Sequence, residues 1–127
     1  MKNDLETRTR AFALSVIHAV GKLSRSQEAR ILGRQLLRSG TSIGANYREA
    51  NRAESHDDFI HKIALFEKEA AESGYWIELI VEAGVSGAST KYFHPLSVEA
   101  RELLAIFVAS GRTAKLRSGR TSARSKQ

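Results

Sequence analysis

Apolar residues recur at helical intervals along most of the 127-residue chain. The clearest run follows steps of four and three through seven positions, which are Phe59, Ile63, Phe66, Ala70, Ser73, Ile77 and Ile80. Residues at such steps lie on one face of an α-helix. The pattern therefore predicts a helix from about Asp57 to Ala83, with Ser55 as its N-cap and Gly84 as its end.

Two helices are predicted on the N-terminal side of this run. The first has Asp4 as its N-cap, ends at residues 21–23, and has an inner face of Leu5, Phe12, Val16, Val20 and Leu23. The second opens with a capping box formed by Ser24 and Gln27 and continues through Ala53. Its inner stripe consists of Leu32, Leu36, Ser39, Ile43, Asn46, Ala50 and Ala53.

A fourth helix is predicted after the Gly- and Ser-rich segment 84–90. Pro95 suits its first turn, and the helix fades after Thr113. Its inner side holds Leu96, Leu103, Leu104, Phe107 and Val108. No segment shows the period-two alternation of a strand. Because short connections make neighbouring helices antiparallel, the predicted fold class is all-α, an antiparallel up-down four-helix bundle.

Small residues interrupt the second helix, where Gly40 and Gly44 lie one turn apart beside the inner stripe. Each glycine costs about 1 kcal/mol relative to alanine inside a helix. Close approach of a neighbouring helix backbone would offset that cost. Asn46 is expected to be buried and hydrogen-bonded, with Ser42 and Glu49 within one turn as partners.

The same segment, Ser39-Gly-Thr-Ser-Ile-Gly-Ala-Asn-Tyr-Arg-Glu-Ala50, resembles the signature helix of the bacterial four-helix-bundle protein family. This family includes proteins encoded in intervening sequences of large-subunit ribosomal RNA genes and is similar to retroelement accessory proteins. The resemblance extends over roughly residues 25–115. It departs from many relatives at Leu23-Ser-Arg-Ser26, where they carry a proline.

The resemblance implies a bundle that assembles into a ring-shaped homo-oligomer, often a homopentamer. It further implies a role in binding nucleic acid, RNA or DNA, or a nucleic-acid-processing enzyme. It implies no established catalytic activity.

The formal charge of +6 is concentrated at the C-terminal end. Residues 115–127 contain no acidic residue, and their basic residues are Lys115, Arg117, Arg120, Arg124 and Lys126. The remaining fifteen basic and fourteen acidic residues nearly cancel. The sequence therefore predicts a bundle domain, residues 1–114, followed by a basic tail, residues 115–127, that is disordered because it has too few apolar groups to offset ordering.

Three arginines, Arg30, Arg34 and Arg38, follow one another at steps of four along the second helix. They form either a solvated face, partly paired with Glu28, or a phosphate-binding ridge. Tyr75 and Trp76 are adjacent, so one of them points away from the inner stripe. This pair either completes the monomer core or forms an oligomer contact.

The residues give little support for catalysis or for a metal site. The chain has no cysteine. Asp58 and His61 make a single acidic-x-x-His pair, and Arg52 precedes His56 with a spacing too short for the Arg–His motif of some helical ribonucleases. We therefore expect no catalytic residues, no metal and no cofactor.

The leading hypothesis is a non-enzymatic, cytoplasmic oligomer that binds nucleic acid or a nucleic-acid-processing partner, without a membrane segment. The alternative is a structural or adaptor oligomer with protein partners only, and a ribonuclease comes third.

Overall fold

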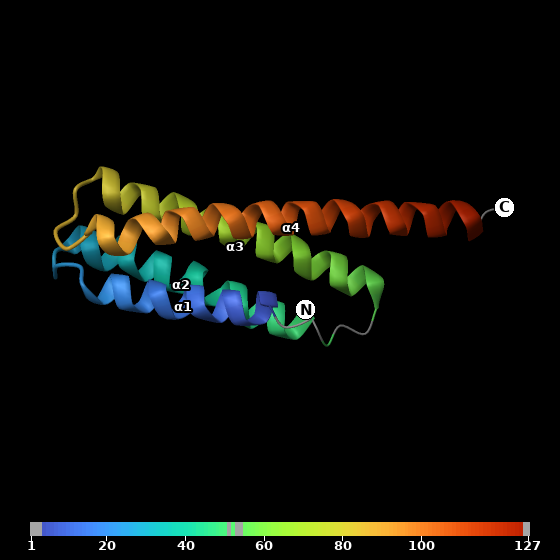
Figure 1. Cartoon of the computed structure of the whole chain (residues 1–127), viewed down its shortest axis with the longest axis horizontal. Helices are drawn as coiled ribbons and strands as arrows, with labels where there is room; N and C mark the ends of the chain where they lie inside the picture. Colours follow the sequence, from blue (N-terminus) through green and yellow to red (C-terminus); the bar gives the residue numbers. More distant parts are fainter. Residues whose placement is uncertain (1–3, 51, 53–54, 126–127) are drawn as a thin grey trace.

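The computed structural model describes residues 4–50, 52 and 55–125, and every regular element in these residues is an α-helix. The four helices are α1 (Asp4–Gly21), α2 (Gln27–Ala50), α3 (His56–Glu82) and α4 (Thr90–Ser125). They pack side by side, and the α1–α2 and α3–α4 connections lie at the same end of the bundle (Figure 1). The predicted all-α four-helix bundle is therefore confirmed.

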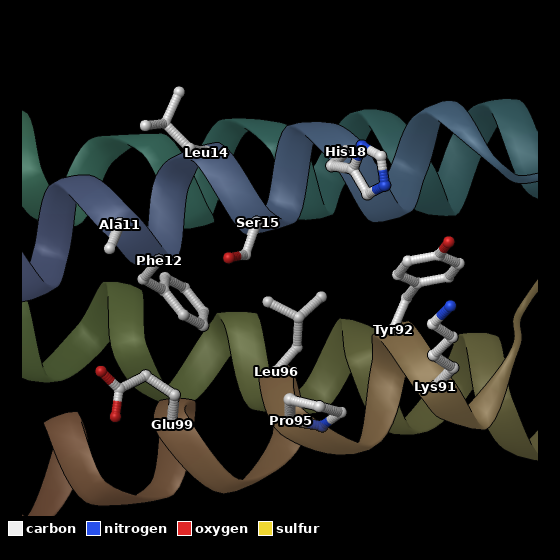
Figure 2. A pocket seen from close by; sticks show the side chains of 10 residues that line it. All are labelled: Ala11, Phe12, Leu14, Ser15, His18, Lys91, Tyr92, Pro95, Leu96 and Glu99. Atoms are coloured by element: carbon white, nitrogen blue, oxygen red, sulfur yellow. The ribbon is translucent and has the colours of Figure 1, made fainter.

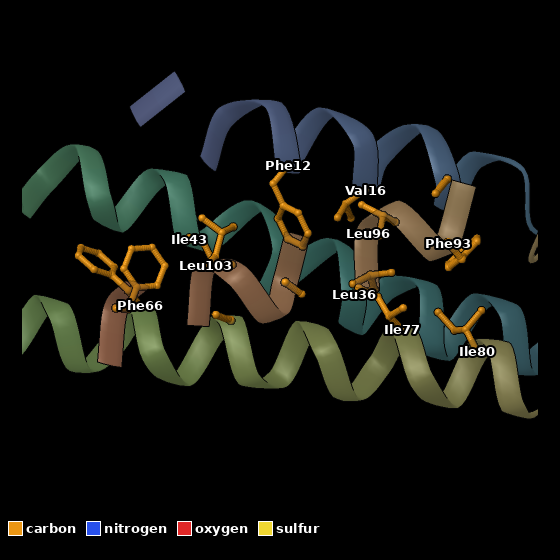
Figure 3. Close-up of a cluster of buried hydrophobic side chains, with 14 of the residues drawn as sticks. Phe12, Val16, Leu36, Ile43, Phe66, Ile77, Ile80, Phe93, Leu96 and Leu103 are labelled. Atoms are coloured by element: carbon orange, nitrogen blue, oxygen red, sulfur yellow. The ribbon is translucent and has the colours of Figure 1, made fainter. Parts of the chain in front are cut away.

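The core lies where the inner faces of the helices meet (Figure 3). The apolar run predicted in α3 faces this core, since Ile63, Phe66, Ala70, Ser73, Ile77 and Ile80 are all buried and only Phe59 is half-buried. Phe66 packs against Phe107 of α4, with ring centroids 5.2 Å apart. Helical periodicity therefore identified the packed face of α3 correctly.

Helix α3 begins and ends as predicted, within one residue. The backbone N–H of Asp58 donates to Ser55 Oγ at 3.1 Å, which makes Ser55 the N-cap. At the other end Gly84 has a φ of 66°, and the Val85 N–H donates to the Ile80 carbonyl at 3.2 Å. This is the Schellman arrangement, in which a left-handed glycine satisfies the last carbonyls of the helix.

The predicted start and end of α2 need correction. The Ala29 N–H donates to Ser26 Oγ, so Ser26 caps the helix in place of Ser24. Ser24 instead bonds to the α3–α4 connection, where its N–H donates to the Ser86 carbonyl at 2.9 Å. The helix ends at Ala50, and the predicted last residue, Ala53, lies outside the described residues.

Helix α4 begins earlier than predicted. It starts at Thr90, where the Lys91 N–H donates to Ser89 Oγ at 3.1 Å, and Pro95 lies inside it. A proline in a helix leaves the carbonyl four residues earlier without its N–H partner. Here that carbonyl belongs to the exposed Lys91, where water can replace the missing donor.

The same helix also ends later than predicted, since it continues past Thr113 to Ser125. Extending an existing helix avoids the nucleation cost that an isolated tail would meet. Ala114 is the last described residue with a buried side chain. The α4 extension, residues 115–125, projects past the ends of the other helices (Figure 1). A separate bundle domain ending at residue 114 stays a prediction.

The glycines of α2 permit close contact with α1. A Cβ atom on Gly40 would lie 2.9 Å from Val16 Cγ2, and one on Gly44 would lie 3.5 Å from the backbone carbonyl carbon of Thr9. The predicted close approach of a neighbouring helix is therefore confirmed. The neighbour is α1 of the same chain, so these glycines serve the fold of the protomer.

On its other side α2 is joined to α3 by a buried pair of serines. Ser39 and Ser73 are fully buried, and their hydroxyl oxygens lie 2.9 Å apart. The Ser73 hydroxyl also lies 2.8 Å from the Glu69 carbonyl oxygen, and Ser39 lies 3.4 Å from that of Leu36. Two hydroxyl hydrogens can therefore be satisfied without a charged group in the core.

Alanine at Gly40 and alanine at Gly74 are expected to change stability in opposite directions. A Cβ on Gly74 of α3 meets nothing within 4 Å, so Gly74→Ala should raise the free energy of unfolding by about 1 kcal/mol. Gly40→Ala forces Val16 to move, and overpacking of this kind costs about 1–3 kcal/mol. Urea unfolding measures both, and equal gains in the two variants would contradict the close α1–α2 contact.

The serine pair is expected to act as a unit. Ser39→Ala and Ser73→Ala should each lower the free energy of unfolding by about 1 kcal/mol, because each leaves a buried hydroxyl with one partner fewer. The double variant should lose less than the sum of the two single variants. A double-mutant cycle by urea unfolding measures this coupling, and simple additivity would show that the hydroxyls act independently.

Candidate nucleic-acid and assembly surfaces

The three arginines of the predicted ridge are all exposed on α2, but they differ in what they contact. Arg38 forms ion pairs with two acidic residues of α3, Glu69 at 3.4 Å and Glu72. The hydrogen bond that Arg38 donates to Glu72 is the main cause of its raised pKa; burial opposes it, and the charges of Glu69 and Glu72 add to it. The Arg38 charge is therefore already compensated within the protomer.

The other two ridge residues have no acidic partner among the described side chains. Arg30 Nε donates to the Arg25 carbonyl oxygen at 3.1 Å, which leaves its charge uncompensated. Arg34 forms no ion pair with any described residue. The predicted three-residue ridge is thus reduced to Arg30 and Arg34.

A second group of arginines lies where α1 and α2 meet. A hollow of about 210 Å³ is lined by Glu6, Arg10, Ala13, Thr41, Gly44, Ala45 and Arg48. Arg10 and Arg48 are exposed at this hollow, and Arg48 comes fourteen residues after Arg34. Steps of seven keep residues on one stripe of a helix, so the sequence could have linked Arg48 to Arg34. Only the tertiary structure places Arg10 and Arg48 at the same hollow.

The predicted signature positions of α2 have different environments. Gly40 is buried, Gly44 is half-buried, and the half-buried Ser42 donates to the Arg38 carbonyl. Asn46 is also half-buried in the protomer, and its burial in an assembly stays a prediction. One proposed partner, Ser42, is bonded to the backbone, and the other, Glu49, accepts from Lys62 Nζ at 3.2 Å.

Tyr75 and Trp76 are adjacent residues of α3 that differ in exposure. Tyr75 is 54% exposed and stands outside the monomer core, whereas Trp76 is half-buried at its edge. The two rings contact edge to face, with centroids 5.1 Å apart. Trp76 Nε1 is buried without a hydrogen-bond acceptor among the described atoms. Ile31 of α2 is 51% exposed. Apolar side chains of α2 and α3 are therefore incompletely covered.

A groove of about 510 Å³ separates α1 from α4, the adjacent helices that touch least (Figure 2). Phe12 and Leu96 lie between the two helices, while Leu14 points away from α4. An ion-pair cluster and an aromatic contact join the two helices. Arg8 pairs with Glu99 at 2.5 Å and with Glu102 at 2.8 Å, and the His18 and Tyr92 rings meet edge to face. The hydrogen bond to Glu99 is the main cause of the raised pKa of Arg8.

The remaining histidines serve the structure or face solvent. His56 Nε2 lies 3.0 Å from the Ala114 carbonyl oxygen and so joins the start of α3 to α4. His61 is exposed. In residues 4–50, 52 and 55–125, no three His, Asp or Glu side chains come together as a metal ion requires. None of the four described helices has the length and apolar character needed to cross a bilayer.

The fold and these surfaces define a class of protein, an all-α four-helix bundle with a basic helical extension. The family model described as 23S rRNA-intervening sequence protein matches residues 1–108. The chain therefore belongs to the family of 23S rRNA-intervening sequence proteins, as its resemblance implied.

A solved structure supports the same assignment. The crystal structure of a protein with unknown function from the S23 ribosomal protein family of Bacteroides thetaiotaomicron VPI-5482 is 32% identical to this chain. The similarity covers 88% of this chain and 99% of that chain, with a TM-score of 0.77. No curated protein matches the chain.

Proposed function

We propose that this protein is a cytoplasmic, non-enzymatic, antiparallel up-down helical bundle that assembles into a ring and binds nucleic acid through basic surfaces. The observation that carries the proposal is the α4 extension. It contains Lys115, Arg117, Arg120 and Arg124, has no acidic residue, and projects beyond the bundle (Figure 1). The family name links its members to intervening sequences of 23S rRNA, which favours a nucleic-acid partner.

Electrostatics favours a polyanion as the partner of this extension. The bundle itself is near neutral, whereas five of the six net charges belong to residues 115–127. At a rise of about 1.5 Å per residue, the eleven residues after Ala114 in α4 extend about 16 Å. A charged helix of this length can follow phosphates and release their counterions, and its prior order lowers the entropy lost on binding.

Assembly is supported by apolar residues on two different sides of the protomer. Tyr75 and Ile31 are exposed on the α2–α3 side, and Leu14 is 57% exposed on α1. Helices α1 and α3 make no substantial contact with each other, since each packs beside α2 and α4. Contacts between two unlike surfaces of successive copies close into a ring when the rotation allows. A ring would repeat the basic extension and strengthen binding through multivalency.

The same apolar surfaces favour an alternative, an adaptor oligomer that binds only proteins. In that case the basic residues would confer solubility and would not bind phosphates. Titration with nucleic acid separates the two functions, because an adaptor would bind neither RNA nor duplex DNA at low salt.

Truncation after Ala114 is expected to weaken nucleic-acid binding and its salt dependence. If all five basic residues of 115–127 engage duplex DNA, the slope of log affinity against log salt should fall by about 4 to 5, at about 0.9 per phosphate. A fluorescence-anisotropy titration at several salt concentrations measures the slope. The control Arg101→Ala removes one exposed charge from the bundle part of α4 and should change the slope little. An unchanged slope after truncation would show that the extension does not bind phosphate.

Tyr75→Glu is expected to dissociate the assembly, because it places a charge in an apolar contact. Multi-angle light scattering should give a multiple of the 14.0 kDa protomer mass for the parent chain and a smaller mass for the variant. Ala64→Glu, which adds the same charge at another exposed site of α3, should leave the mass unchanged. A parent chain of 14 kDa at micromolar concentration would refute the ring.

A further inference from the structure

We infer that the arginine-lined hollow between α1 and α2 is a second phosphate-binding site, which holds the nucleic-acid backbone along the outer face of α2. This inference rests on the proposed function and assigns it a site on the rigid bundle, separate from the α4 extension. We define the α1–α2 phosphate site by Arg10 and Arg48, which both line the hollow.

The hollow exists because small residues line it. Gly44 has no side chain at this place, where a Cβ would be in ordinary van der Waals contact with the carbonyl oxygen of Thr9 at 3.5 Å. Ala13 and Ala45 provide only methyl groups at the walls. Apart from Glu6, Arg10 and Arg48, the residues that line this hollow of about 210 Å³ have small side chains. A phosphate group can therefore approach both arginines without displacing protein atoms.

The charges at the hollow are positive in sum. Arg10 and Arg48 form no ion pair with any described residue. Glu6 is the single acidic residue among the lining side chains, so two cations face one carboxylate. Two arginines elsewhere, Arg8 and Arg38, are each paired with two glutamates. Arg10 and Arg48, which have no acidic partner among the described residues, are therefore available to bind an external anion.

The arginines are the main hydrogen-bond donors that the hollow offers to an anion, because its one hydroxyl group is already used. The Thr41 hydroxyl donates to the Leu37 carbonyl oxygen at 2.6 Å, so its hydrogen is committed to the helix. Guanidinium groups carry several donors in a planar fork, which matches the oxygens of a phosphate. Binding at this site therefore depends on Arg10 and Arg48.

The spacing of basic residues along α2 fits a nucleic-acid backbone. Arg34, Thr41 and Arg48 follow one another at steps of seven, which places them along one stripe of α2. The fourteen residues from Arg34 to Arg48 extend about 21 Å at a rise of about 1.5 Å per residue. One DNA strand presents a phosphate about every 3.4 Å along the duplex axis, so the stripe is long enough to meet more than one phosphate of a bound backbone. Contacts of this kind set orientation and do not read base sequence.

The test compares Arg10→Ala/Arg48→Ala with a matched control that removes two other exposed charges, Arg38→Gln/Arg101→Gln. Each full-length protein is titrated with fluorescent duplex DNA and structured RNA at 50 and 200 mM salt. Loss of two phosphate contacts should lower the log–log slope by about 1.8. Raising the salt should then weaken the parent about tenfold more than the double variant. The control should keep the parent slope.

A second variant separates charge from folding. Arg10→Lys/Arg48→Lys keeps both charges and should retain most of the parent salt dependence, while circular dichroism confirms that each variant remains helical. If the parent binds nucleic acid and Arg10→Ala/Arg48→Ala gives the same slope of log affinity against log salt, the α1–α2 phosphate site is refuted. The α4 extension is then the binding element. A parent that binds neither nucleic acid overturns the site and the proposed function together.

Discussion

The close approach of α1 to α2 is the constraint on which the rest of the bundle depends. Gly40 and Gly44 leave room for Val16 and for the Thr9 backbone, and larger residues on α2 would separate the helices. The opposite flank of α2 is joined to α3 by the buried Ser39–Ser73 pair. Helix α2 therefore determines the positions of both neighbours, and the cost of its two glycines is offset by this packing.

This arrangement leaves the α1–α4 side of the bundle open. Helix α1 is held by α2 and α4 is held by α3, so the contact between α1 and α4 is less extensive. Arg8 and its two glutamates join these helices at one level, and the His18–Tyr92 ring contact joins them at another. The groove in Figure 2 thus results from the way the helices are paired, which also leaves Leu14 exposed on α1.

Five arginines of α1 and α2 fall into two groups with different physical roles. Arg8 and Arg38 each join two helices through carboxylates of the neighbouring helix, so their charge is used within the protomer. Arg10, Arg34 and Arg48 have no such partner among the described side chains and face solvent. Exposed ion pairs contribute little to stability, but they do reduce the field that an external phosphate meets. Helix α2 therefore carries both kinds of arginine on neighbouring stripes.

The sequence by itself determined the number of helices, the packed face of α3 and the caps at Ser55 and Gly84, because helical period and capping depend on residues a few positions apart. The tertiary structure decided what depends on distant residues. Ser26 caps α2 in place of Ser24, and the Ser24 N–H donates to the Ser86 carbonyl of the α3–α4 connection. Arg38 is neutralised by acidic residues 31 and 34 positions away, and Arg10 meets Arg48 only where α1 lies against Gly44. Such long-range pairs follow from how the helices pack, which no local pattern encodes.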